Sequence, residues 1–228
     1  MSEVQIRYDV PATLVAKSVP VDGERHGIAH IADAARRSIQ GAGVRRSSTD
    51  ERLVSFLQRE RHMGPLEFID YTFQVECPLF IAMQILRHRT VSYSMMSGRY
   101  CEMLPHFWAP AEPRAQHAQA MQCSGATLSK DAQEDALVYY QTAYEDAWTH
   151  YTHLLSLGIS REQARAVLPE STYTQLWMKG NLRNWMHFIE LRRATNAQGP
   201  VREIAQQVTR EICRDLGNGS GQLLGLED

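Results

Sequence analysis

The change of hydrophobic pattern at Pro78 is the feature that most constrains the fold of this chain. Before it, from Phe68 to Val75, apolar side chains alternate with polar ones and β-branched and aromatic residues are common, which predicts a half-buried strand. After it, residues 79–86 are almost wholly apolar and include alanine, methionine and glutamine, which favours a buried helix that begins at the proline. We therefore expect an α/β (α+β) fold, in which a sheet and helices share one core.

Further segments with a period of two or of about 3.6 residues predict the remaining elements. Strands are predicted at residues 4–10 and 172–178, and helices at 27–40, after the Ser48 and Glu51 capping box, at 129–157, 160–168, 181–195 and 200–216. In the longest helix, from Ser129 to the stop at Gly158, the apolar stripe is Ala136, Tyr140, Ala143, Ala147, Tyr151 and Leu154. Residues 100–127 have no period and are expected to be irregular. We expect one domain over residues 1–217 and a loosely ordered C-terminal tail over residues 218–228.

Composition narrows the classes of function. Of the 228 residues, 43% are hydrophobic and 22% charged, as in ordinary folded proteins, and the net charge of -2 argues against a surface adapted to a nucleic acid polymer. The N-terminus lacks the basic and apolar regions of a signal peptide and no window reaches about 18 uninterrupted apolar residues, so we expect no membrane association and a cytoplasmic location. Four widely spaced cysteines, Cys77, Cys101, Cys123 and Cys213, predict reduced thiols and no metal site.

A basic interval lies between Glu76 and Glu102, where no acidic residue occurs. It holds three arginines, a histidine, three serines and a glycine: Arg87, His88, Arg89, Ser92, Ser94, Ser97, Gly98 and Arg99. Arginine forks, hydroxyls and the backbone N–H groups of a glycine-containing turn together form anion sites, so residues 97–99 are a candidate phosphate site. On composition alone, a solvated loop whose arginines pair with distant acids explains the interval equally well.

The order of residues 87–100 resolves this choice, because it resembles the signature of the flavin-dependent thymidylate synthases, R-H-R-x-x-S-x-N-x-x-S-x-R-Y. Every defined position matches except Ser94, where the family has Asn. Further stretches agree with the family in the same order, so that the resemblance extends over roughly residues 25 to 210: residues 34–38, His62 through Pro65 to Glu67, Gln84, Arg165 before Leu168 and Pro169, Asn181, Arg183, residues 191–192 and residues 197–198.

The resemblance implies reductive C5-methylation of a uracil mononucleotide, with methylenetetrahydrofolate as carbon donor, FAD as the hydride carrier and NADPH as reductant. It also implies an α/β fold with long helices, a homotetramer, and a flavin site shared between subunits. The residues that it assigns to FAD are Ser38, His62, Glu67, Arg87, His88, Arg89, Asn181, Arg183 and His187. Those that it assigns to the nucleotide are Gln84, Arg87, Ser97, Gly98, Arg99, Arg165 and Arg192.

Arg192 and His62 are the candidate catalytic residues. An arginine placed against a uracil carbonyl stabilises the negative charge that builds on the ring as C5 becomes nucleophilic, an electrostatic effect on the order of 3 kcal/mol. Taken alone, a histidine such as His62 is more often an ordinary partly buried residue than a catalytic one. The resemblance to the family is the reason for naming it a candidate. No G-x-S-x-G motif surrounds Ser97, so a phosphate donor is the better interpretation than a nucleophile. The chain also lacks the glycine fingerprint of a Rossmann site, because Gly41-x-Gly43 has no third glycine.

Several departures from the family pattern leave the substrate open. Ser94 replaces Asn, Met95 replaces an acid, Gly64 replaces Ser or Thr, and His187 and Asn196 replace the commoner Asn and His. A branch of the family in nucleoside-antibiotic biosynthesis methylates UMP, so UMP, dUMP or both are candidates. The alternatives are an ordinary thymidylate synthase specific for dUMP and a non-catalytic homologue that binds flavin or nucleotide. An RNA-binding module lacks support, since no aromatic RNP-like strand is present.

Overall fold

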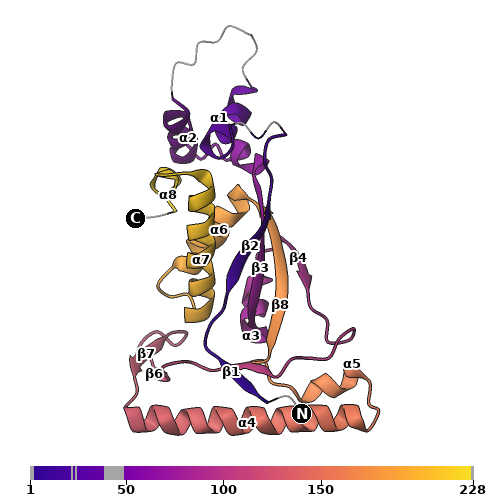
Figure 1. Ribbon diagram of the computed structural model, residues 1–228. Coiled ribbons are helices and arrows are strands. Elements are labelled where there is room, and N and C mark those ends of the chain that lie inside the picture. The colour runs from indigo at the N-terminus through magenta and orange to yellow at the C-terminus, as the bar shows by residue number, and fades with distance from the viewer. Residues whose placement is uncertain (1–2, 22, 24, 39–48, 227–228) are drawn as a thin grey trace.

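A four-stranded antiparallel sheet forms the centre of the computed structural model, which describes residues 3–21, 23, 25–38 and 49–226 (Figure 1). Its strands, in spatial order, are β2 (Ala12–Lys17), β3 (Asp70–Pro78), β8 (Tyr173–Asn181) and β4 (Ser92–Met95). The helices are α1 (Ile28–Arg36), α2 (Asp50–Arg59), α3 (Leu79–Ile85), α4 (Lys130–Ser156), α5 (Arg161–Ala164), α6 (Leu182–Arg193), α7 (Gly199–Leu216) and α8 (Ser220–Leu223). The predicted mixture of helix and sheet is thereby confirmed.

The main core lies between one face of this sheet and the helices α3, α6 and α7. The alternation of β3 buries Tyr71, Phe73 and Val75, as the sequence pattern predicts. Trp185 of α6 packs edge-on against Phe73 at 4.9 Å and donates its indole N–H to the backbone oxygen of Tyr71 at 3.1 Å. Pro78 occupies the N-cap position of α3, so the predicted change from strand to helix is confirmed, although only one face of α3 is buried and Met83 is 48% exposed.

A second core forms under α4, which lies across one end of the sheet while α1 and α2 lie at the other (Figure 1). Ser129 caps α4 by accepting from the backbone N–H of Ala132, which confirms the predicted start. The buried stripe differs from the prediction: Tyr144 and Trp148 are buried, whereas Tyr140 and Ala143 are exposed. Tyr144 reaches the core because its ring stacks on Phe107 at 4.9 Å.

Several short strands depart from the sequence expectations. The strand expected at 4–10 is only β1 (Gln5–Arg7), which pairs in parallel with β5 (His106–Trp108), and the unpredicted β2 follows it. Residues 100–127, expected to be irregular, also contain the antiparallel pair β6 (Arg114–Gln116) and β7 (Ser124–Thr127). The expected helix end at Gln40, the Gly41 and Gly43 stop, and the capping residue Ser48 lie outside the described residues. Thr49 is the observed N-cap of α2.

The C-terminal segment, expected to be loosely ordered, forms α8 and buries Leu224 and Leu226. The end of α7 is fixed by Asp215, whose carboxylate accepts from Lys17, from His26 Nε2 at 2.7 Å and from the Tyr71 hydroxyl at 2.9 Å. Burial opposes ionisation of Asp215, but these hydrogen bonds outweigh it and hold the pKa below its ordinary value. No helix among the described residues is long and apolar enough to cross a membrane.

Candidate active site

Arg192, in the last turn of α6, is held by two acceptors from the segment that ends α3. Its Nε donates to His88 Nε2 at 2.9 Å, and its Nη2 donates to the backbone oxygen of Gln84 at 2.9 Å. The Gln84 side chain in turn donates to Gln198, at the start of α7. The structure therefore brings together Gln84, His88 and Arg192, three residues that the sequence placed in the site.

His88 must be neutral for this arrangement, because its Nε2 accepts a hydrogen bond. Its ring is 7% exposed and meets Phe188 edge-on at 4.9 Å. Burial first, and then the charges of Arg192 and His187, lower the pKa of His88 to about 4. Burial also lowers the pKa of Arg192 from its ordinary value. The single hydroxyl proton of Tyr93 is shared between the backbone oxygens of Ile85 and His88, at 2.8 and 2.9 Å, which fixes the turn beneath the pair.

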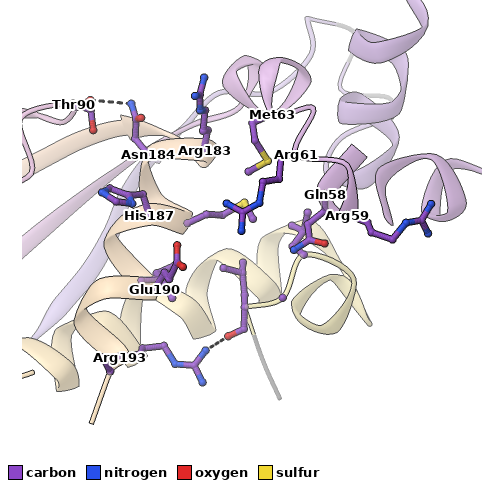
Figure 2. Close-up of a pocket in the computed structure, with 16 residues that line it drawn as sticks. Gln58, Arg59, Arg61, Met63, Thr90, Arg183, Asn184, His187, Glu190 and Arg193 are labelled. Atoms are coloured by element: carbon purple, nitrogen blue, oxygen red, sulfur yellow. Dashed lines mark hydrogen bonds between the residues drawn. The ribbon is translucent and has the colours of Figure 1, made fainter. Parts of the chain in front are cut away.

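A cavity of about 1070 Å³ opens between the end of α2, α6 and the C-terminal segment (Figure 2). Its lining residues are Gln58, Arg59, Arg61, Met63, Thr90, Arg183, Asn184, Met186, His187, Ile189, Glu190, Arg193, Ala194, Leu224, Gly225 and Leu226. The lining contains four arginines and a single acidic residue, so the cavity favours an anionic ligand. The methionines and leucines add an apolar surface on which planar rings can pack.

Two of the predicted flavin residues line this cavity, and two more, Glu67 and Asn181, contact residues of its lining. Arg183 and His187 line it, and Arg183 donates to Glu67. Asn181 caps α6 by accepting from the backbone N–H of Asn184 at 3.0 Å, which positions the first turn of the helix at the cavity wall.

The other predicted flavin residues lie outside the lining. His62 is exposed beside Arg61 and Met63, with the Phe56 ring edge-on at 6.0 Å. Arg87 and Arg89 are exposed on the turn after α3, and His88 is turned toward Arg192. Ser38 is exposed and donates to the backbone oxygen of Ala35 at 2.9 Å.

The predicted phosphate residues form a separate group near α5. Gly98 is buried, and a Cβ at this position would lie 2.9 Å from Met103 Sδ and 3.1 Å from Arg165 Cδ. A side chain at this position would therefore displace the side chains of Met103 and Arg165. Ser97 Oγ accepts from the backbone N–H of Arg99 at 3.3 Å, and Arg99 pairs with Glu162 at 3.2 Å.

The two groups of predicted nucleotide residues belong to different cores. Gln84 and Arg192 lie on elements of the main core, whereas Gly98 contacts Met103 of the second core. Within the described ranges, no hydrogen bond or ion pair joins residues 97–99 or Arg165 to Gln84 or Arg192. Within one chain these residues therefore form two groups that no hydrogen bond or ion pair between described residues joins.

The residues that depart from the family pattern occupy exposed positions. Ser94 and Met95 lie on the edge strand β4, opposite Trp177 and Leu176 of β8, and Met95 is 42% exposed. Gly64, which begins a 3₁₀ turn over residues 64–68, has no atom near the position of a Cβ. Each replacement could therefore be reversed without crowding the core.

Cys77 is fully buried, and burial raises the pKa of its thiol to about 12. The thiol is therefore unsuited to act as a nucleophile. The other three cysteines, Cys101, Cys123 and Cys213, are partly buried.

Sequence reasoning missed the residues that close the cavity. Arg193 donates to the backbone oxygen of Leu226 (Figure 2), so that the C-terminal segment forms one wall. Arg61 lines the opposite side, next to the end of α2. The only signal in the sequence is the charged stretch at residues 59–62, Arg-Glu-Arg-His, which has the composition of many solvated helix ends.

One family of known proteins matches most of this chain. The family model described as "Thymidylate synthase complementing protein" matches residues 21–216. The flavin-dependent thymidylate synthase of Thermus thermophilus is 38% identical over 186 residues, which cover 81% of this chain and 67% of the relative. That of Thermosipho melanesiensis is 34% identical over 77% of each chain.

Solved structures show the same likeness. The UMP/dUMP methylase PolB from Streptomyces cacaoi, bound with 5-Br UMP, superimposes with a TM-score of 0.80 and 29% identity over 94% of this chain and 93% of that one. Its complex with 5-Br dUMP gives a TM-score of 0.79 and 32% identity over 93% of each chain. Because the family model and the relatives cover most of the chain, this protein belongs to the flavin-dependent thymidylate synthases, a family of methyltransferase enzymes.

Proposed function

We propose that this protein is an FAD-dependent methylase that acts at C5 of the uracil ring in both UMP and dUMP. Methylenetetrahydrofolate would supply the carbon and NADPH the reducing equivalents. The observation that carries the proposal is the position of Arg192, a half-buried guanidinium whose orientation is fixed by His88 and by the backbone of Gln84.

Arg192 would act by electrostatic stabilisation of the uracil ring. Among the described residues, His88 and Gln84 engage two of its five N–H groups, and the other three would be available to a substrate carbonyl. A preorganised donor in a water-poor site stabilises developing negative charge without a reorganisation cost. Charge that accumulates at C5 makes that carbon a nucleophile toward the one-carbon donor. His62, beside the cavity, is the second residue that we propose contacts the reacting groups.

The cavity lined by Arg183 and His187 fits FAD in charge and in surface. Arg61, Arg183 and Arg193 would balance the two phosphate charges, and Met63, Met186 and Leu224 offer apolar contact to the rings. The reduced flavin supplies the hydride that completes the methyl group. Asn181 and Glu67 would orient the site, since one caps α6 and the other holds Arg183.

The separation of the two nucleotide groups supports a homotetramer. Ser97, Gly98, Arg99 and Arg165 would grip the phosphate of a nucleotide whose base lies at Gln84 and Arg192 of another chain. The surface of α4 offers apolar contact area for such an assembly, because Val138 and Tyr139 are 62% and 72% exposed. Arg87 and Arg89, exposed on the turn after α3, would then contact the flavin across subunits.

Acceptance of both sugars rests on the edge strand β4. Ser94 and Met95 replace an amide and an acid, so this strand lacks two groups able to select one pattern of ribose hydroxyls. The PolB structures, bound with 5-Br UMP and with 5-Br dUMP, resemble this chain over nearly its whole length.

A competition assay tests the proposal. With FAD, NADPH and methylenetetrahydrofolate present, kcat/KM for UMP should equal or exceed that for dUMP. The Ser94→Asn/Met95→Glu double variant should shift the preference toward dUMP, because it restores the groups that discriminate. Gly64→Ser, on another exposed turn, is a control for the effect of restoring a family residue elsewhere.

A dUMP preference above about a hundred-fold, equivalent to about 2.7 kcal/mol, would instead identify an ordinary thymidylate synthase. Absence of methylation with both nucleotides, in protein that binds FAD, would identify a non-catalytic homologue.

A further inference from the structure

Arg61 has a backbone conformation that arginine rarely adopts. Its φ is +57°, in the left-handed region, at the second residue beyond the end of α2. The helix closes there, since the N–H of Arg61 donates to Gln58 at 3.1 Å and the N–H of His62 donates to Leu57 at 2.8 Å. Glycine is the usual residue at such a helix end, because it alone meets no steric penalty. An arginine at this position keeps a strained backbone, and such strain gathers at functional sites.

The side chain of Arg61 extends into the large cavity. Figure 2 shows it between Met63 and Glu190, whereas the neighbouring Arg59 points away from the cavity. Two other arginines of the lining are engaged, Arg183 with Glu67 and Arg193 with the backbone of Leu226. In the part of the chain that the structure describes, the Arg61 side chain forms no hydrogen bond or ion pair. Its donors are therefore available to a ligand.

We propose that Arg61 is a ligand-binding residue that donates to the diphosphate of the flavin dinucleotide in this cavity. The inference deepens the proposed function and rests on it. A guanidinium presents parallel N–H donors that match two phosphate oxygens, and it is more weakly hydrated than an ammonium group. The left-handed backbone directs this fork inward, which explains why the helix ends on an arginine despite the strain.

The Arg61→Gly variant distinguishes a role of Arg61 in FAD binding from a role in the stability of the fold. Arg61→Gly relieves the strained backbone, so the melting temperature without added FAD should rise by about 2 to 4 °C. The same change removes the phosphate partner, so the Kd for FAD, measured by fluorescence titration, should increase about ten-fold or more. A residue that served only the fold would not move these two quantities in opposite senses.

Three further measurements sharpen the test. Arg61→Lys keeps the charge and should retain more of the FAD affinity than the glycine variant. Arg59→Ala removes a cation from the same rim whose side chain points away, and should change the Kd for FAD less than two-fold, about 0.4 kcal/mol. Riboflavin, which lacks the diphosphate, should bind wild type and Arg61→Gly equally.

The inference is overturned if wild type binds FAD and Arg61→Gly binds it within two-fold, or if the glycine variant loses riboflavin and FAD affinity alike. If wild type itself binds no flavin, the flavin assignment fails first and this inference fails with it.

Discussion

Replacing His88 by glutamine should flatten the dependence of stability on pH. In the folded protein the pKa of His88 is about 4, because the ring is buried and lies beside Arg192. In the unfolded chain it returns to about 6.5. Between these pH values His88 is protonated in the unfolded chain and neutral in the folded chain. Its contribution to the free energy of unfolding is therefore complete above about pH 6.5 and is lost as pH falls toward 4.

The size of the effect follows from the two pKa values. At pH 5 the proton linkage of His88 lowers the free energy of unfolding by about 2 kcal/mol relative to pH 8. Glutamine does not titrate, yet its side-chain oxygen can accept the N–H of Arg192. Urea unfolding at the two pH values should therefore show His88→Gln losing about 2 kcal/mol less than wild type.

His150→Gln, on the exposed face of α4, is the matched control and should keep the wild-type dependence on pH. Equal losses in wild type and His88→Gln, within about 0.5 kcal/mol, would refute the reasoning. So would an NMR titration that places the midpoint of His88 near the ordinary histidine value.

Three further predictions concern single contacts. Thr49→Ala removes the N-cap of α2 and should lower the free energy of unfolding by about 1 kcal/mol in urea titrations, whereas no measurable change would mean that the cap contributes nothing. Asp215→Asn weakens the charged acceptor shared by Lys17, His26 and Tyr71, and should cost about 1.5 to 3 kcal/mol by the same measurement; a loss under about 0.5 kcal/mol contradicts it. Gly98→Ala places a methyl group against Arg165, and calorimetry should show about ten-fold weaker UMP binding with unchanged FAD binding; equal UMP affinity would disprove this role for the loop.

Local signals account for the parts of the fold that could be predicted. The alternation of β3, the proline that starts α3, and the capping residues Ser129 and Asn181 each act within a few residues of chain. Such local patterns predict the observed elements because packing in the core stabilises the conformation that each segment already prefers.

Non-local pairing explains most of what could not be predicted. β1 and β5 are three residues long and are defined by each other, across about a hundred residues of sequence, so neither carries a period that can be recognised. The buried stripe of α4 shifts to Tyr144 and Trp148 because Phe107 of β5 provides the surface on which they pack. α8 is likewise stabilised by contacts with α2 and α7 rather than by its own four residues.

The candidate site likewise contains some features that could be predicted from the sequence and others that could not. The motif at residues 87–100 identifies His88 and Arg99 from one continuous segment. The partnership of His88 with Arg192 joins residues a hundred positions apart, and the strained backbone of Arg61 leaves no trace in composition. A motif therefore identifies candidate residues in the sequence, whereas the packing of distant elements decides how their side chains are oriented.

The presence of two separate cores gives the protein a modular character. If residues 97–99 and Arg165 recognise the nucleotide phosphate, recognition is supported by the aromatic cluster of α4, while Arg192 and the cavity are supported by the sheet and its helices. Substitutions among Phe107, Tyr144 and Trp148 can then alter the affinity for nucleotides while the structure around the cavity stays the same. Natural variation and laboratory evolution thus have two nearly independent parts to adjust, and a new nucleotide preference can arise by rebuilding one of them.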